Sequence, residues 1–140
     1  VTGVQTCALP IYREIFSPLL SDYSWHIRKP LNIKAMQIAS NFLIGKHDFS
    51  AFRASDCQAD NPIRTLNNIT IIKNQDILKI RISAPSFLYN MVRIISGTLV
   101  EIGLEKYEAE KIKEIMKSKN RKNAGQTAPA KGLFLIKIKY

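Results

Sequence analysis

Apolar and polar residues alternate in four stretches of the chain, which is the pattern of a strand with one buried face. Only Asn74 and Gln75 separate the second stretch from the third. These two stretches are therefore predicted to form a β-hairpin. The four predicted strands are residues 21–28, 64–73, 76–83 and 133–140.

Three further stretches carry apolar residues every three or four positions, which is the spacing of a helix. The first begins after Asn32, whose side chain can cap a helix, and stops at Gly45. The second, residues 85–103, is apolar almost all round, which is typical of a buried helix. The third, residues 105–118, is amphipathic. This order of elements predicts an α+β domain with a mostly antiparallel sheet and helices packed on one face.

The first residues of the chain do not share these patterns. Residues 1–11 show neither helical nor strand periodicity. We expect them to be a non-native, unstructured scar, and residues 12–140 to form a single domain.

The composition is that of a globular domain, since 46% of the residues are hydrophobic. No apolar run approaches the roughly 18 residues that a membrane-spanning helix needs, so no membrane partner is expected. The chain has two cysteines and no visible secretory signal. These features argue against a disulfide scaffold and favour a cytoplasmic protein.

The net charge of +10 is concentrated toward the C-terminus. Residues 111–140 hold nine basic side chains and one acidic side chain, against twelve and ten in residues 1–110. Such a basic segment favours a polyanionic partner, most often nucleic acid. A lysine-rich tail that only keeps the protein in solution has the same composition, so charge alone leaves both interpretations open.

Arg93 is the candidate for chemistry, because a guanidinium among apolar helix neighbours is costly to bury without a partner. It lies in one predicted row with Ser86, Asn90 and Gly97. In a structural interpretation, Arg93 reaches solvent or pairs with a structural carboxylate. In a functional interpretation, it lies in a cleft and holds a catalytic carboxylate ionised or binds a phosphate. Asn90 and Gly97 would then offer an amide and room for a close approach to the substrate.

A metal site is not expected. His26, His47 and Cys57 are the residues that could ligate a transition metal, and their spacing fits no known ligand pattern.

Several spaced motifs together resemble one family. Residues 87–93 read Phe-Leu-Tyr-Asn-Met-Val-Arg, and residues 127–133 read Thr-Ala-Pro-Ala-Lys-Gly-Leu. With the segments 45–53, 62–65 and 95–103, they resemble the C-terminal half of the tRNA pseudouridine synthase A family, in the same order. The resemblance covers residues 12–140.

The resemblance implies an isomerase that converts uridine to pseudouridine in the anticodon stem-loop of tRNA, without metal or redox cofactor. Such enzymes use an aspartate nucleophile and flip the base out of its stack. By motif match, Arg93 would be the cation paired to that aspartate, Tyr12 the aromatic that stacks on the base, and Leu133 the apolar wall beneath it. The predicted RNA contacts are Arg13, Arg53, Arg64, Lys119, Arg121 and Lys122.

The chain departs from the family in one respect. The Gly-Arg-Thr-Asp motif that carries the family's nucleophile is not found in these residues. We therefore expect this chain to be inactive by itself. The resemblance also implies that the full-length protein is a homodimer. The alternative is a non-catalytic basic module that binds RNA.

Overall fold

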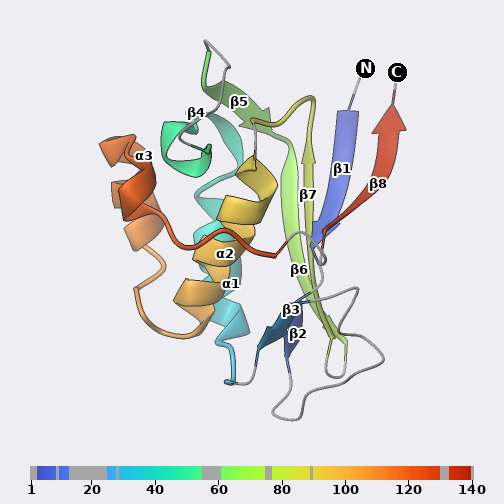
Figure 1. Cartoon of the computed structure of the whole chain (residues 1–140), viewed down its shortest axis with the longest axis vertical. Coiled ribbons are helices and arrows are strands. Elements are labelled where there is room, and N and C mark those ends of the chain that lie inside the picture. The colour runs from blue at the N-terminus through green and yellow to red at the C-terminus, as the bar shows by residue number, and fades with distance from the viewer. Residues whose placement is uncertain are drawn as a thin grey trace.

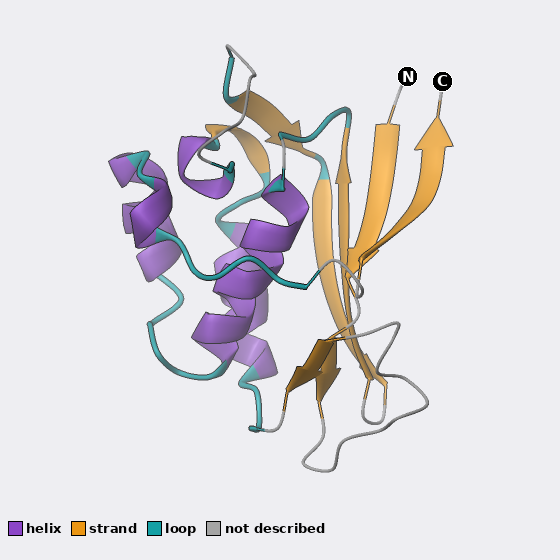
Figure 2. Cartoon of the chain, viewed as in Figure 1, coloured by secondary structure: helices purple, strands orange, loops and turns teal. Residues whose placement is uncertain are grey.

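The structure is a computed structural model that describes residues 3–8, 10–12, 25–27, 29–54, 61–74, 77–88, 90–129 and 133–139. In the first three ranges, and again in 133–139, only the backbone is described, apart from the side chain of Ile27. The helices lie together on one face of a sheet, which confirms the predicted α+β class (Figures 1 and 2).

Strand β7, Ile77–Ala84, is the centre of the large sheet. On one side it pairs antiparallel with β6, Asn68–Asn74, so the predicted hairpin is confirmed. On its other side lie β1, Gly3–Ala8, and β2, Pro10–Tyr12. The sheet is completed by β8, Leu133–Lys139, antiparallel to β1, and by β3, Trp25–Ile27, parallel to β2.

The N-terminal segment corrects one prediction. We expected residues 1–11 to be unstructured, but β1 and β2 follow β7 in one register, from Val4 opposite Ala84 to Ile11 opposite Ile77. The physical reason is that a strand with unpaired N–H and C=O groups accepts almost any extended partner. Main-chain pairing of this kind needs no side-chain periodicity, and the sequence pattern therefore does not reveal it.

A second small sheet corrects another prediction. Residues 64–73 were expected to form one strand, but they divide between β5, Ile63–Leu66, and β6. Strand β5 pairs antiparallel with β4, Gly45–Asp48, a strand that the sequence pattern did not predict. Leu66 and Ile69 are both buried although they are three residues apart. That odd spacing breaks the alternation of a single strand, and the chain changes direction there.

The first helix begins as predicted and the next two begin later. Helix α1, Ile33–Asn41, is capped by Asn32, whose Oδ1 accepts from the Ala35 amide at 3.1 Å. Helix α2, Met91–Gly103, starts only after Asn90, which has a left-handed backbone (φ 60°). Helix α3 spans Lys111–Ser118. Left-handed residues cannot continue a right-handed helix, and Glu105 is left-handed as well (φ 64°), so the predicted starts at 85 and 105 were too early.

The core lies between the helices and the inner face of the sheet. Leu78, Ile80 and Ile82 of β7 are fully buried, and so are Ile95 and Leu99 of α2. The predicted buried character of α2 is therefore confirmed. No helix in the described part of the chain is long and apolar enough to cross a membrane.

Candidate functional site

Arg93 lies in the first turn of α2, and its side chain is half-buried. Its Nε donates a hydrogen bond to the Ala128 carbonyl at 2.8 Å, and its Nη1 donates to Asn90 Oδ1 at 3.2 Å. The Ala128 amide donates in turn to the Arg93 carbonyl at 3.0 Å. Arg93 is thus joined through both side chain and main chain to the segment that leads into β8.

No carboxylate neutralises Arg93 among the residues that the structure describes. Its Nη2 makes no hydrogen bond to any of these residues either. Of the two structural interpretations, the pairing of Arg93 with an acidic group of its own domain therefore finds no support there, while a half-buried side chain is compatible with the other, contact with solvent. Two of the guanidinium nitrogens orient the group, and the third is left to donate to an anion.

The segment before β8, residues 124–129, crosses the surface of α2 (Figure 1). We call it the crossing segment. Its close approach requires Gly97, because a Cβ built at that position would overlap the carbonyl oxygen of Gln126. The Gly125 amide donates to Thr98 Oγ1 at 2.9 Å, and that hydroxyl donates to the Ile94 carbonyl at 2.8 Å. The crossing segment is therefore held against α2 by direct backbone contact.

Arg121 also contacts this segment. It is the first residue of the 3₁₀ turn η2, Arg121–Asn123. Its Nη1 donates to the Gly125 carbonyl at 2.9 Å, and its Nη2 donates to Thr127 Oγ1 at 3.0 Å.

The structure brings together some of the predicted site residues. Asn90 and Arg93 are in direct contact, while Ser86 lies before the helix and is not part of its row. Gly97 contacts the main chain of residue 126, whereas we predicted that a substrate would lie close to it. The sequence analysis missed the Ala128 carbonyl and Thr98. A carbonyl has no sequence signal, because every residue carries one.

The two residues predicted to contact the base are described by their backbones alone. Tyr12 ends β2, opposite Ile27 of β3, and Leu133 begins β8, opposite Ala8 of β1. Their side chains lie outside the described part of the structure, as does the whole of Arg13.

Among the described residues, the predicted RNA contacts lie on or next to several short elements. Arg64 Nη1 donates to the carbonyls of Asn61 and Ile63, at 2.7 and 2.8 Å, on the short strand β5. Arg53 follows the 3₁₀ turn η1, Ser50–Phe52, and is half-buried. Lys122 lies in η2 and its side chain is exposed.

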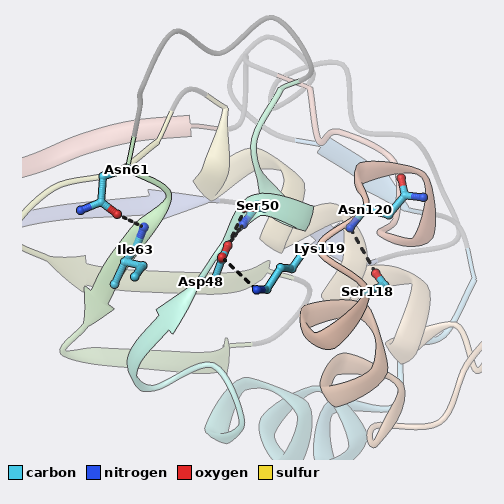
Figure 3. A network of polar contacts seen from close by, with 7 residues as sticks. All are labelled: Asp48, Ser50, Asn61, Ile63, Ser118, Lys119 and Asn120. Atoms are coloured by element: carbon cyan, nitrogen blue, oxygen red, sulfur yellow. Dashed lines mark hydrogen bonds and ion pairs between the residues drawn. The ribbon is translucent and has the colours of Figure 1, made fainter.

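Lys119 directly follows α3 and forms an ion pair with Asp48, with Nζ and Oδ2 3.7 Å apart (Figure 3). The amide and the hydroxyl of Ser50 also donate to Asp48 Oδ1. Burial by itself raises the pKa of Asp48, but these hydrogen bonds and the Lys119 ammonium outweigh it and lower the pKa below 3.8. Asp48 is therefore ionised at neutral pH and pairs with the residue that follows α3.

A shallow cavity of about 360 Å³ lies beside this ion pair. The ammonium of Lys113 lies 4.4 Å from the centre of the Phe42 ring at its wall. The cavity thus combines apolar and cationic walls. It is lined by Phe42, His47, Asp48, Lys113, Met116 and Lys117. Within the described residues, no three His, Cys, Asp or Glu side chains gather as a metal ion requires.

Comparison with known proteins finds a family model and several relatives that are all described as tRNA pseudouridine synthases. A model of the tRNA pseudouridine synthase family matches residues 39–140. The chain is 52% identical over 128 residues to tRNA pseudouridine synthase A of Thermoanaerobacter pseudethanolicus, covering 91% of this chain and 52% of that protein. It is 50% identical over 127 residues to tRNA pseudouridine synthase A of Ehrlichia chaffeensis, covering 89% of this chain and 52% of that protein.

A third relative, tRNA pseudouridine synthase A 2 of Clostridium tetani, is 48% identical over 128 residues, again with 91% and 52% covered. The chain therefore spans about half the length of the curated relatives it matches. The family model matches well over half of the chain, including Arg93, the crossing segment and β8. This chain belongs to the tRNA pseudouridine synthase family.

Proposed function

We propose that this chain is the part of a tRNA pseudouridine synthase that supplies the active-site cation, Arg93, for the isomerisation of uridine in the anticodon arm of tRNA. The observation that carries the proposal is the geometry of Arg93. It is oriented by Ala128 and Asn90, and it has no acidic partner within the described residues.

The reaction explains why such a cation is needed. In uridine the N1–C1′ bond breaks and a C5–C1′ bond forms, while C5 loses a proton and N1 gains one. Nothing is oxidised, so the enzyme needs to supply only a nucleophile, a binding site for the base and groups that transfer protons. A nucleophilic aspartate must stay ionised inside a site that excludes water. A guanidinium within hydrogen-bond distance lowers the pKa of that carboxyl group and keeps it charged.

The aspartate in this proposal comes from outside these 140 residues. Leu133 is assigned to the wall beneath the uracil, because β8 begins five residues after Ala128, whose carbonyl orients Arg93. Tyr12 is assigned to stacking on the base by its family motif alone. Arg13, Arg53, Arg64, Lys119 and Lys122 are assigned to the phosphates, in keeping with the positive charge of the chain. The whole protein is proposed to act as a cytoplasmic homodimer.

A chimera tests the role of Arg93. This chain replaces the part that it matches in the Thermoanaerobacter relative, and pseudouridine formation in unmodified tRNA is measured. Arg93→Gln should lower kcat at least about 100-fold, the usual effect of removing one charge-stabilising donor. The affinity for tRNA should stay within a few fold, because Arg93 is assigned to the carboxylate and not to a phosphate.

Arg93→Lys is the matched variant, since it keeps the charge and loses the planar group that contacts Ala128 and Asn90 together. It should recover part of the activity. If Arg93→Gln turned over tRNA at the rate of the unchanged chimera, Arg93 would not be the catalytic cation. If it lost tRNA affinity and activity in equal measure, Arg93 would be an RNA contact, as in a non-catalytic binding module.

A further inference from the structure

Arg121 was predicted to contact RNA, but its guanidinium makes hydrogen bonds to residues of its own chain. Both terminal nitrogens donate to the crossing segment, to the Gly125 carbonyl and to Thr127 Oγ1. We infer that Arg121 is a positioning residue, which holds residues 125–128 against α2 so that the Ala128 carbonyl orients Arg93. This inference rests on the function proposed above for Arg93, and it adds a residue that acts on the site from a distance.

The contacts form a continuous path from Arg121 to Arg93. Arg121 binds residues 125 and 127, and the next residue along, Ala128, exchanges two hydrogen bonds with Arg93. The Gly125 amide is bound to Thr98, one turn and a half further along α2 than Arg93. Each contact restrains a residue within three positions of Ala128, through a backbone atom at Gly125 and Ala128 and through the hydroxyl at Thr127.

The crossing segment needs such support because it has little of its own. Residues 124–129 form neither helix nor strand, and Pro129 has no N–H to donate. Their carbonyls must be satisfied by side chains or by water. A guanidinium suits this task better than an ammonium, because its planar fork reaches two acceptors at once in a fixed geometry.

The neighbouring residue offers a matched control. Lys122 carries the same charge in the same 3₁₀ turn, but its side chain is exposed whereas that of Arg121 is half-buried. If basic charge in this turn served only to attract RNA, the two residues would behave alike. If Arg121 positions the segment, removing it has a local effect that removing Lys122 does not have.

The experiment uses the 140-residue chain with the variants Arg121→Gln, Arg121→Lys and Lys122→Gln. Amide hydrogen exchange is followed by NMR at Gly125 and Ala128, and exchange of the Nε–H proton is followed at Arg93. Arg121→Gln should speed exchange of all three protons about 10-fold, because the segment loses two hydrogen bonds. Lys122→Gln should leave them unchanged, and Arg121→Lys should give an intermediate rate.

Two further readouts separate positioning from other roles. Amides of Ile80 and Ile95 in the core should keep their protection in Arg121→Gln; if they lost it to the same degree, Arg121 would merely stabilise the fold. The salt dependence of binding to an anticodon stem-loop RNA should flatten in Lys122→Gln by slightly less than one unit, and should not change in Arg121→Gln.

The inference is overturned if Arg121→Gln leaves the exchange of Ala128 and of Arg93 Nε–H unchanged, or if it flattens the salt dependence as Lys122→Gln does. The exchange results are independent of the proposed function. A chain that binds no RNA would contradict the proposed phosphate contacts, while the exchange data would still decide whether Arg121 positions Arg93.

Discussion

At Gly97 the missing side chain matters, because the main chain of another segment occupies its place. Any Cβ there would overlap the carbonyl of Gln126. In the sequence, a small residue in the same row as Arg93 indicated only that something comes close. The structure identifies that neighbour as the segment whose next residues orient Arg93.

Gly97→Ala should therefore destabilise the protein by about 1–3 kcal/mol, the cost of overpacking a tight site, although alanine is the better helix former. Chemical denaturation measures this change. Ser96→Ala is the control on the same helix, since the Ser96 hydroxyl is buried without a partner among the described residues. Its loss should leave the stability equal or higher. A Gly97→Ala protein as stable as its parent would contradict the close approach.

Among the elements, α2 shows how one backbone angle places a site. The helix begins at Met91 because Asn90 has a left-handed backbone, and Arg93 therefore lies in the first turn. The Arg93 carbonyl of that turn accepts from the Ala128 amide of the crossing segment, and Asn90 Oδ1 accepts from Arg93 Nη1. One residue thus ends the loop before α2 and orients the guanidinium.

Two variants separate these effects. Asn90→Gly keeps the left-handed backbone without strain and loses only the contact with Arg93. Asn90→Ala loses the contact and adds the steric cost of a left-handed alanine, about 1–2 kcal/mol. Denaturation midpoints should therefore rank Asn90→Ala below Asn90→Gly. Equal midpoints for the two variants would show that the backbone angle at Asn90 imposes no cost.

At the scale of the whole molecule, the described residues supply one half of the charge pair that we propose. Arg93 contacts the crossing segment, which passes over α2 on the way to β8 (Figure 1). The proposed mechanism also requires a nucleophilic carboxylate, and none is paired with Arg93 in this part of the chain. Binding of RNA needs only the positive charges, so binding and turnover can be separated.

The 140-residue chain should bind an anticodon stem-loop in a salt-dependent way and form no pseudouridine from unmodified tRNA. Mass spectrometry of digested tRNA measures the product, and the chimera described above is the positive control. Turnover by the isolated chain above background would show that its own residues include the nucleophile.

The amino-acid sequence by itself determined most of the local structure. Asn32 predicted the start of α1, the alternation on both sides of Asn74 predicted the hairpin, and the continuous apolar character of α2 predicted its burial. It also singled out Arg93, because a cation on an apolar helix is conspicuous in any sequence. These features depend on residues close together in the chain, whose side chains carry the signal.

Tertiary structure alone decided which elements and segments contact one another. The pairing of β1 and β2 with β7, the crossing of residues 124–129 over Gly97, and the carbonyl that orients Arg93 all join residues far apart in the chain. Their atoms are mostly backbone atoms, which are the same in every residue. No side-chain pattern records such contacts, so they become visible only when the folded chain brings the backbones together.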